Sequence, residues 1–545
     1  MRVAVVGSGP AGVAAAEALL DGGLEVEMLD VGHEIEPEGI ALAERLREGR
    51  ESAADRARLA PPRARAGGLT RALHLLAGIA GREALLDLTG KARLGSLFTF
   101  RDVDWGIPVR VEGRAAPLSR SLARGGLSNV WGAACYPLAS EDYAGWPLAE
   151  ADLAPHYEAV ARLLSLIQPR DELARVYPLY GPASPGLPLN PTAALVAEHW
   201  RRHQGELAHR GLCCGRARLA VRARDGAGGH GCQLCGLCLA GCPWDAIYRA
   251  DWTLAELSRR AGFRYRPGLL VRRFRQEPGR VVAEVLEGRD APRELEYQAL
   301  FLAAGTLSSL RIAAESLGAW GRRAGLLDND VYLLPMLRTA GGGVPAAPLH
   351  FSLNELALRV PVEGRALHVQ IYCLSPQVID RMAAWLPPRA RRRLDSLQAR
   401  LLLAFVYLPA ADSARLSARV EAGEPVGTLV LEQGRGAESR RLARALGRAL
   451  REGAGALGLR PLGPALRSTP AGHSGGHLAG ALPMAAQPGP LETAPDGRLG
   501  GAGRVYVVDG AALPRLPAQN STFTLMANAH RIAAGFASRA GAGPA

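Results

Sequence analysis

The stretch RVAVVGSGPAGVAAAEAL, residues 2–19, decides the fold. An apolar run leads directly into Gly7, Gly9 and Gly12, and an alanine-rich segment typical of a helix follows. Glycines at this spacing allow a tight turn and let backbone amides at a helix N-terminus approach a pyrophosphate. A second strand-like run, LEVEMLD, ends at Asp30, where a carboxylate can accept the hydroxyls of a ribose. The stretch therefore predicts an α/β protein with a Rossmann-like dinucleotide-binding domain.

The composition is that of an ordinary globular protein with room for two or more domains: 545 residues, of which 48% are hydrophobic and 21% charged. The net charge of +13 comes almost entirely from arginines that are scattered along the chain. Aromatic residues make up only 5% of the chain, which is few for a protein that stacks bases on aromatic rings. We therefore expect no nucleic-acid partner.

The N-terminal sequence predicts a cytoplasmic protein. A strand-like run begins at Arg2, which leaves no room for the charged and apolar regions of an export signal. The longest apolar runs, such as residues 401–408, fall short of the roughly twenty residues that a transmembrane helix needs. We therefore expect no transmembrane segment, and cysteines that are free thiols or metal ligands rather than disulfides.

The middle of the chain changes its pattern. Short β-type runs between Leu349 and Glu432, among them HVQIYCL and LLLAFVYL, predict an antiparallel sheet within the α/β protein. The basic and apolar segment from Arg56 to Arg93 is typical of weakly amphipathic helices. Two interpretations of that segment stay open, a surface excursion or lid and a patch that lies on a membrane.

Four further segments resemble motifs of the glucose-methanol-choline (GMC) oxidoreductases, in that family's order. Residues 120–146, RSLARGGLSNVWGAACYPLASEDYAGW, resemble its glycine-rich flavin-contact segment. Residues 299–312, ALFLAAGTLSSLRI, resemble the strand with which the chain returns to the flavin domain. AGHSGGHLAGALPM, residues 471–484, and the segment 504–533 resemble the C-terminal pair of motifs.

The resemblance implies FAD as the cofactor. It implies a discontinuous FAD-binding domain of residues 1–150, 225–318 and 466–545, and an α+β substrate-binding domain of residues 151–224 and 319–465 with the antiparallel sheet. The adenosine end of FAD would lie at Gly7, Gly9, Gly12 and Asp30. The remaining expected contacts are with the pyrophosphate and ribityl chain, at Asp509 and Gly510, and with the isoalloxazine, at Gly125, Gly126, Ser128 and Asn129.

The resemblance also implies two catalytic residues. In this family a histidine in the pattern H-x-x-G-T-x-x-M accepts the hydroxyl proton, and His477 matches this pattern with Ala481 in place of the threonine. The second polar residue, which orients the substrate oxygen, falls on Asn520, although Ser521 replaces the usual proline. A neutral imidazole near its unperturbed pKa is suited to accept a proton at cytoplasmic pH. His473 is the rival base.

GHGCQLCGLCLAGCPWDAIY, residues 229–248, has the spacing C-x2-C-x2-C-x3-C-P of bacterial ferredoxins, and it predicts a 4Fe-4S or 3Fe-4S cluster on Cys232, Cys235, Cys238 and Cys242. Because the run occurs once, a single cluster requires Cys242 to fold back or a remote ligand. The remote candidates are Cys135, Cys213, Cys214 and Cys373. The alternative is a structural cysteine loop, since many GMC relatives carry a Cys- and Gly-rich loop here.

Together these features predict FAD-dependent oxidation of an alcohol, of sugar or natural-product type, to a carbonyl by hydride transfer. The expected partners are this small molecule and an electron acceptor, which the sequence leaves open among oxygen, a quinone and a protein. Two alternatives also stay open: a carrier that passes electrons between flavin and an iron-sulfur cluster, and a non-redox lyase on the same fold.

Overall fold

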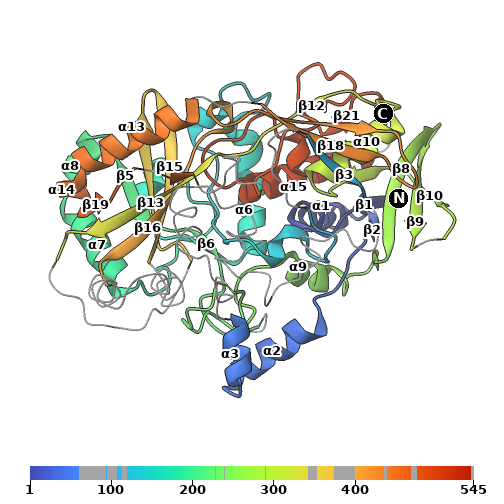
Figure 1. The fold of residues 1–545 in the computed structure, drawn as a ribbon. Coiled ribbons are helices and arrows are strands. Elements are labelled where there is room, and N and C mark those ends of the chain that lie inside the picture. The colour runs from blue at the N-terminus through green and yellow to red at the C-terminus, as the bar shows by residue number, and fades with distance from the viewer. Residues whose placement is uncertain are drawn as a thin grey trace.

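A computed structural model describes residues 1–59, 94, 107–112, 120–226, 229–238, 240–288, 290–341, 353–373, 399–434, 438–464, 466–467 and 476–541. Most of the amphipathic segment 56–93 and the rival histidine, His473, lie outside these residues. The described part of the chain is a mixed α/β structure with parallel and antiparallel sheets (Figure 1).

A six-stranded sheet forms the centre of the dinucleotide-binding part, in the order β21, β22, β11, β1, β2, β7. Its strands are β1 (Arg2–Val6), β2 (Glu25–Leu29), β7 (Phe263–Arg266), β11 (Leu300–Leu302), β21 (Arg498–Leu499) and β22 (Ala502–Val507). All neighbours are parallel except β21 and β22. The carboxyl ends of β1, β2, β11 and β22 therefore lie along one edge, which is where open α/β sheets bind ligands. The α/β prediction is confirmed.

Strand β1 is apolar throughout its buried length because helices or strands cover both of its faces. Val3 and Val5 pack in one core with α1 (Pro10–Asp21), α6 (Glu150–Leu163), α9 (Ala250–Leu257) and α15 (Thr522–Gly541). Ala4 and Val6, which point to the opposite face, pack in a second core with α10 (Thr306–Ser316), β8 (Leu269–Glu277), β9 (Arg280–Glu287) and β10 (Arg293–Tyr297). An apolar run without polar alternation is typical of a parallel strand between two layers.

A seven-stranded antiparallel sheet lies at the other end of the molecule (Figure 1). Six of its strands follow the order β19, β13, β16, β15, β14, β5, and β20 pairs with β13. Its strands are β5 (Cys213–Arg216), β13 (Val331–Arg338), β14 (Leu356–Val362), β15 (Arg365–Cys373), β16 (Leu401–Tyr407), β19 (Leu459–Pro461) and β20 (Leu466–Arg467). One face packs against α7 (Pro191–Arg202), α8 (Gln204–His209), α13 (Glu438–Glu452) and α14 (Ala454–Leu457). The runs HVQIYCL and LLLAFVYL form β15 and β16, as the β-type pattern predicts.

Two further β-type runs of this interval, ARLSARV (414–420) and GTLVLEQ (427–433), form a different sheet. Strands β17 (Leu416–Glu421) and β18 (Thr428–Gln433) lie between β12 (Ala324–Leu326) and β3 (Val109–Glu112). Leu416, Ala418 and Leu429 are buried in the core of α10 and the parallel sheet rather than in that of the seven-stranded sheet. These strands therefore pack on the dinucleotide-binding part, and the domain limits expected from the sequence stay a prediction.

The remaining elements are short or peripheral. Strands β4 (Leu166–Ile167) and β6 (Leu219–Ala220) pair with each other, and α2 (Pro37–Arg47) and α3 (Ala53–Leu59) project from the body below the parallel sheet (Figure 1). The short 3-10 helices are η3 (Gly126–Asn129), η4 (Ser140–Tyr143), η5 (Glu172–Arg175), η6 (Ala410–Asp412) and η7 (Gly510–Ala512).

A buried ion pair joins α10 to its neighbours. The guanidinium of Arg311 contacts Glu315 at 2.8 Å, and the two side chains are 0% and 2% exposed. Arg311 also donates to the backbone oxygens of Val271 and Arg272 on β8, while Glu315 accepts from the backbone N–H of Gly427. These additional hydrogen bonds offset part of the cost of burying both charges in the low-dielectric interior.

We predict that Glu315→Ala lowers the free energy of unfolding by about 3–5 kcal/mol, because it leaves the Arg311 charge buried without its partner. Denaturant unfolding of the variant and the wild type measures this difference. Glu198→Ala is the matched control, since Glu198 pairs with Arg201 on the surface and such pairs contribute about 0–1 kcal/mol. Equal effects of the two substitutions would contradict the structural role of the buried pair.

Candidate active site

The glycine turn after β1 combines two tightly packed positions with one open position. A Cβ atom on Gly7, whose φ is +102°, would lie 2.6 Å from the carbonyl oxygen of Ala303. A Cβ on Gly12 would lie 2.0 Å from the carbonyl oxygen of Gly7. A Cβ on Gly9, the N-cap residue of α1, would meet no heavy atom within 4 Å. Packing therefore requires glycine at positions 7 and 12, whereas Gly9 borders open space at a helix N-terminus, where a phosphate can be bound.

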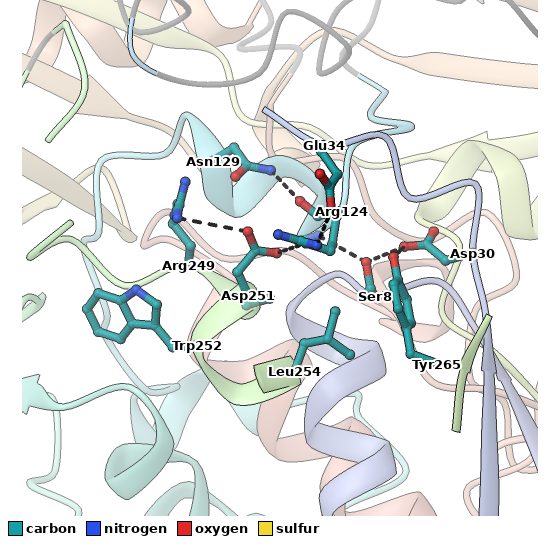
Figure 2. Close-up of polar contacts among 12 residues, drawn as sticks. Ser8, Asp30, Glu34, Arg124, Asn129, Arg249, Asp251, Trp252, Leu254 and Tyr265 are labelled. Carbon is teal, nitrogen blue, oxygen red and sulfur yellow. Dashed lines mark hydrogen bonds and ion pairs between the residues drawn. The ribbon is translucent and has the colours of Figure 1, made fainter. Parts of the chain in front are cut away.

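Asp30 lies at the carboxyl end of β2 and contacts two hydroxyl groups (Figure 2). The hydroxyl of Ser8 donates to its Oδ2 atom, and the hydroxyl of Tyr265 donates to the same atom at 3.1 Å. Burial raises the pKa of Asp30 to about 6, and these hydrogen bonds oppose that rise. Ser8 also accepts from the backbone N–H of Gly125 at 2.9 Å, so this serine joins the glycine turn to the segment around η3.

The segment from Gly125 to Asn129 lies against the glycine turn. A Cβ on Gly126 would be 3.2 Å from the Cα atom of Gly9, so the two backbones approach closely. Ser128 donates to the carbonyl of Gly125 at 2.5 Å and accepts from the N–H of Ala250 at 2.9 Å. The amide nitrogen of Asn129 donates to two carbonyls, while its Oδ1 atom is buried and has no hydrogen-bond partner within the described chain. The Asn129 oxygen and the open space at Gly9 fit a bound cofactor with hydrogen-bond donors.

An ion-pair network that the sequence analysis missed supports this segment (Figure 2). Arg124 contacts Glu34 at 2.7 Å and Asp251 at 3.5 Å, and Asp251 also lies 3.9 Å from Arg249. Burial raises the pKa of Asp251, and the two arginines oppose that rise. A Cβ atom on Gly125 would lie 2.9 Å from the Oδ1 atom of Asp251, so the two residues are in close contact. The network therefore holds the start of α9 against the left-handed turn at Gly125.

Asp509 connects the ends of two neighbouring parallel strands. Its Oδ2 atom accepts from the N–H of Gly305, at the end of β11, and from the hydroxyl of Ser309, while Oδ1 accepts from the N–H of Ala511. Burial raises the pKa of Asp509 and the three hydrogen bonds lower it. The backbone carbonyl of Gly510 accepts a hydrogen bond from the N–H of Gly480 at 3.0 Å. These contacts place both residues beside the histidine motif, and their contact with a cofactor stays a prediction.

His477 and Asn520 lie side by side although 43 residues separate them in the chain. The Nδ2 atom of Asn520 is 3.2 Å from the Nε2 atom of His477. The backbone after His477 is held on both sides, because Ala479 pairs with Leu327 and Gly480 bonds to Gly510. The ring of Tyr407 stacks on the imidazole, with centroids 5.4 Å apart. The structure thus brings the two sequence-predicted polar groups together.

Asn329, which sequence motifs do not single out, fixes the tautomer of His477. The amide nitrogen of Asn329 donates to the carbonyls of Leu408 and Pro517 at 2.7 and 2.9 Å. Its Oδ1 atom, an acceptor only, lies 3.0 Å from the Nδ1 atom of His477. Nδ1 must therefore carry the hydrogen, which leaves Nε2 of the neutral ring as a proton acceptor. Burial lowers the pKa of His477 below its ordinary value of 6.5, and Asp328 opposes this effect.

The cysteine loop packs against the segment at η3. Cys238 is buried, Cys232 and Cys242 are partly buried, and Cys235 is exposed. The Sγ atom of Cys242 accepts from the N–H of Ala246 at 3.3 Å. Within the described residues, no group of three or more His, Cys, Asp or Glu side chains is arranged to hold a metal ion. The structure therefore gives no support to the predicted iron-sulfur cluster.

A cavity of about 30 Å³ separates this loop from the η3 segment. The residues that line it include Ser128, Asn129 and Trp131 on one side and Cys238, Cys242 and Arg249 on the other. Trp131 donates through its indole N–H to the carbonyl of Tyr248 at 2.7 Å. The loop thus forms a wall next to the orphaned oxygen of Asn129.

Comparisons with known proteins identify the class to which this fold and site correspond. Residues 438–529 match the family model described as GMC oxidoreductase. The match includes both His477 and Asn520, and it confirms the resemblance that the sequence motifs indicate. GMC oxidoreductases bind FAD, so the match identifies an FAD-dependent oxidoreductase that acts on CH–OH groups.

Among solved structures, the chain is similar to the pyridoxine 4-oxidase from Mesorbium loti. The two share 17% sequence identity with a TM-score of 0.59, and the similarity covers 98% of this chain and 99% of the other. This likeness shows a common fold. No curated protein matches the sequence. None of the described helices has both the length and the hydropathy that crossing a bilayer requires.

We predict that Gly9→Val abolishes FAD retention, because its side chain would fill the space that the open N-terminus of α1 leaves for the pyrophosphate. The flavin absorbance per purified chain measures retention. Gly503→Val is the matched control, since a Cβ there also meets no atom within 4 Å but lies on β22 away from the turn. A Gly9→Val protein with full flavin content would contradict the assignment.

Proposed function

We propose that this enzyme oxidises a small alcohol to a carbonyl, with His477 as the base that accepts the hydroxyl proton. The observation that carries the proposal is the pairing of His477 Nε2 with Asn520 Nδ2, on a ring whose tautomer Asn329 fixes. Nε2 has the lone pair that a proton acceptor needs, and it points toward an amide that can bind a substrate oxygen.

We propose that FAD binds where the carboxyl ends of β1, β2 and β22 lie next to the segment around η3. The proposed contact residues are Gly7, Gly9, Gly12, Asp30, Gly125, Gly126, Ser128, Asn129, Asp509 and Gly510. The open space at Gly9 and the unpartnered oxygen of Asn129 support this set. FAD, when bound, supplies the acceptor for the hydride of the carbinol carbon.

The proposed reaction divides the two hydrogens of the alcohol. The O–H proton goes to His477 Nε2 as the C=O bond forms, and the hydride of the breaking carbinol C–H bond would be taken up by FAD as its acceptor. Asn520 donates its N–H to the substrate oxygen and orients it. Because burial lowers the pKa of His477, the ring is neutral and able to accept a proton at neutral pH.

The substrate is, in our proposal, a hydroxyl compound of sugar or natural-product type. Pyridoxine is a reasonable first test compound, because the structurally similar enzyme is named as a pyridoxine 4-oxidase. One aromatic ring lies against the proposed base, since Tyr407 stacks on His477 with ring centroids 5.4 Å apart. This ring supports a substrate with an apolar or aromatic part.

We predict that His477→Ala retains FAD and slows flavin reduction by about 10²- to 10⁴-fold, because the proton acceptor is lost. Asn520→Ala should slow it less, since it removes one oriented hydrogen bond. In the wild type the rate should rise with pH through a midpoint below 6.5, because only the neutral imidazole accepts a proton. Anaerobic stopped-flow measurements with a competent alcohol test these rates.

His473→Ala is the control for this prediction, because His473 is the other histidine of the same motif. It should leave both the rate and its pH dependence unchanged. If His473→Ala slowed flavin reduction strongly and His477→Ala did not, the proposed base would be His473 instead. A flavin that no alcohol reduces would favour the non-redox lyase instead.

We propose that the cysteine loop is a structural wall of the flavin site rather than an electron exit. Cys238 is buried in the core, Cys232 and Cys242 pack against it, and the described residues show no group arranged to hold a metal. We predict that anaerobically purified protein contains no stoichiometric iron or sulfide, and that Cys235→Ser leaves flavin reduction within about twofold, as is usual for an exposed residue outside a site. About three or four irons per chain, lost in Cys235→Ser, would instead establish a cluster.

A further inference from the structure

Asn520 is itself held by a second amide, that of Gln370 on β15. The Nε2 atom of Gln370 donates to the Oδ1 atom of Asn520 and lies 3.3 Å from the Nε2 atom of His368. The hydroxyl of Tyr372 donates to the Oε1 atom of Gln370 at 3.0 Å. Gln370 is 1% exposed, so water does not compete for these bonds. Gln370, Asn520 and His477 thus form a continuous chain of hydrogen bonds, which we call the amide chain.

The direction of the amide chain follows from two backbone carbonyls. Carbonyls only accept, so the contacts with Leu408 and Pro517 fix the amide nitrogen of Asn329 on their side. Its oxygen then faces Nδ1 of His477, which must donate, and Nε2 must accept. Asn520 therefore turns its nitrogen to Nε2 and its oxygen to Gln370. Each amide has one orientation in which donors meet acceptors.

We propose that Gln370 is a positioning residue: it holds Asn520 with its N–H toward His477 and the substrate oxygen, and so keeps His477 neutral until it takes the substrate's proton. The part that concerns the substrate rests on the proposed function. The part that concerns the imidazole rests on the amide chain alone.

The physical reason lies in what a protonated His477 would need. A protonated imidazole donates from Nε2 as well as from Nδ1. The N–H of Asn520 and the N–H at Nε2 would then point at each other, and neither could accept. An Asn520 amide that turned over would present its oxygen and stabilise the imidazolium. Gln370 opposes that turn, because its own N–H would then face the N–H of Asn520. The chain thereby disfavours the charged ring and orients the one N–H that a substrate oxygen can accept.

Several other groups act on His477, and one of them, His368, also contacts Gln370. Asp328 raises the pKa of His477, and His368, itself neutral because burial lowers its pKa to about 3, lies close enough to interact with it. Arg359 acts on His368 from β14, and Tyr407 stacks on the ring from β16. A change in the titration of His477 on removal of the Gln370 amide therefore reports the amide chain when the His368 signal in the same spectra shows that this ring is still neutral.

The test is ¹³C- and ¹⁵N-histidine NMR of the full-length protein, in which the signal that His477→Gln removes identifies His477. In the wild type we expect the Nδ1–H tautomer and a titration midpoint below 6.5. Gln370→Leu should raise the midpoint by about one pH unit, because Asn520 becomes free to accept from the imidazolium. Gln370→Glu should raise it further, since a carboxylate accepts from Asn520 and also attracts the positive ring.

Gln168→Leu is the matched control. Gln168 is 2% exposed and donates to the carbonyls of Tyr180 and Pro182 outside the amide chain, so its loss removes a buried amide without changing the titration of His477. An unchanged midpoint in folded Gln370→Leu and Gln370→Glu would overturn the proposal. The NMR measurement requires no substrate, so it separates failure of this inference from failure of the proposed reaction. With a competent alcohol, Gln370→Leu should also move the acid limb of the flavin-reduction rate to higher pH by the same amount.

Discussion

The site depends on one buried carboxylate at the edge of the parallel sheet. Asp509 accepts hydrogen bonds from Gly305, Ser309 and Ala511, and so holds the end of β22 against the start of α10. The turn that it forms provides the carbonyl of Gly510, to which Gly480 bonds. Gly480 tolerates no side chain, since a Cβ would lie 2.7 Å from Leu327. The two segments that carry the proposed catalytic residues, 477–484 and 509–520, are thus aligned by a carboxylate whose three hydrogen bonds go to Gly305, Ser309 and Ala511.

The features that could be predicted from the sequence are those that depend on residues close together in the chain. The glycine turn, the strand that ends at Asp30 and the runs that form β15 and β16 follow from periodicity and backbone requirements that a single stretch carries. The register of the histidine motif also placed His477 correctly beside Asn520. Asn329 and Gln370 could not be found in this way, because their roles arise from partners 148 and 150 residues away. Nothing in LLDNDVYLLP or HVQIYCL distinguishes an amide that orients another amide from one that is merely polar.

The cysteine run shows what residue spacing alone leaves open. Cluster binding needs thiolates that point to a common centre, and that depends on the loop backbone as well as on the intervals between residues. Here the loop turns through Leu234, with a φ of +52°, and through Gly236 and Gly241, and Cys242 accepts from a neighbouring N–H. The runs that form β17 and β18 show a similar limit, since their β character was predictable but the sheet they join depends on contacts with β3 and β12.

The hydrogen bond from His477 to Asn329, which fixes the tautomer of the ring, also restricts how the proposed base would lose its proton after each turnover. Nδ1 is committed to Asn329, whose own nitrogen ends at two backbone carbonyls, and a carboxamide does not readily pass protons on. In the proposed reaction, the proton that Nε2 receives is not passed on through Nδ1 and Asn329, so it leaves from the Nε2 side, where the substrate would bind. Release of that proton and release of the carbonyl product would then use the same side of the ring, and a product that leaves slowly would also delay deprotonation.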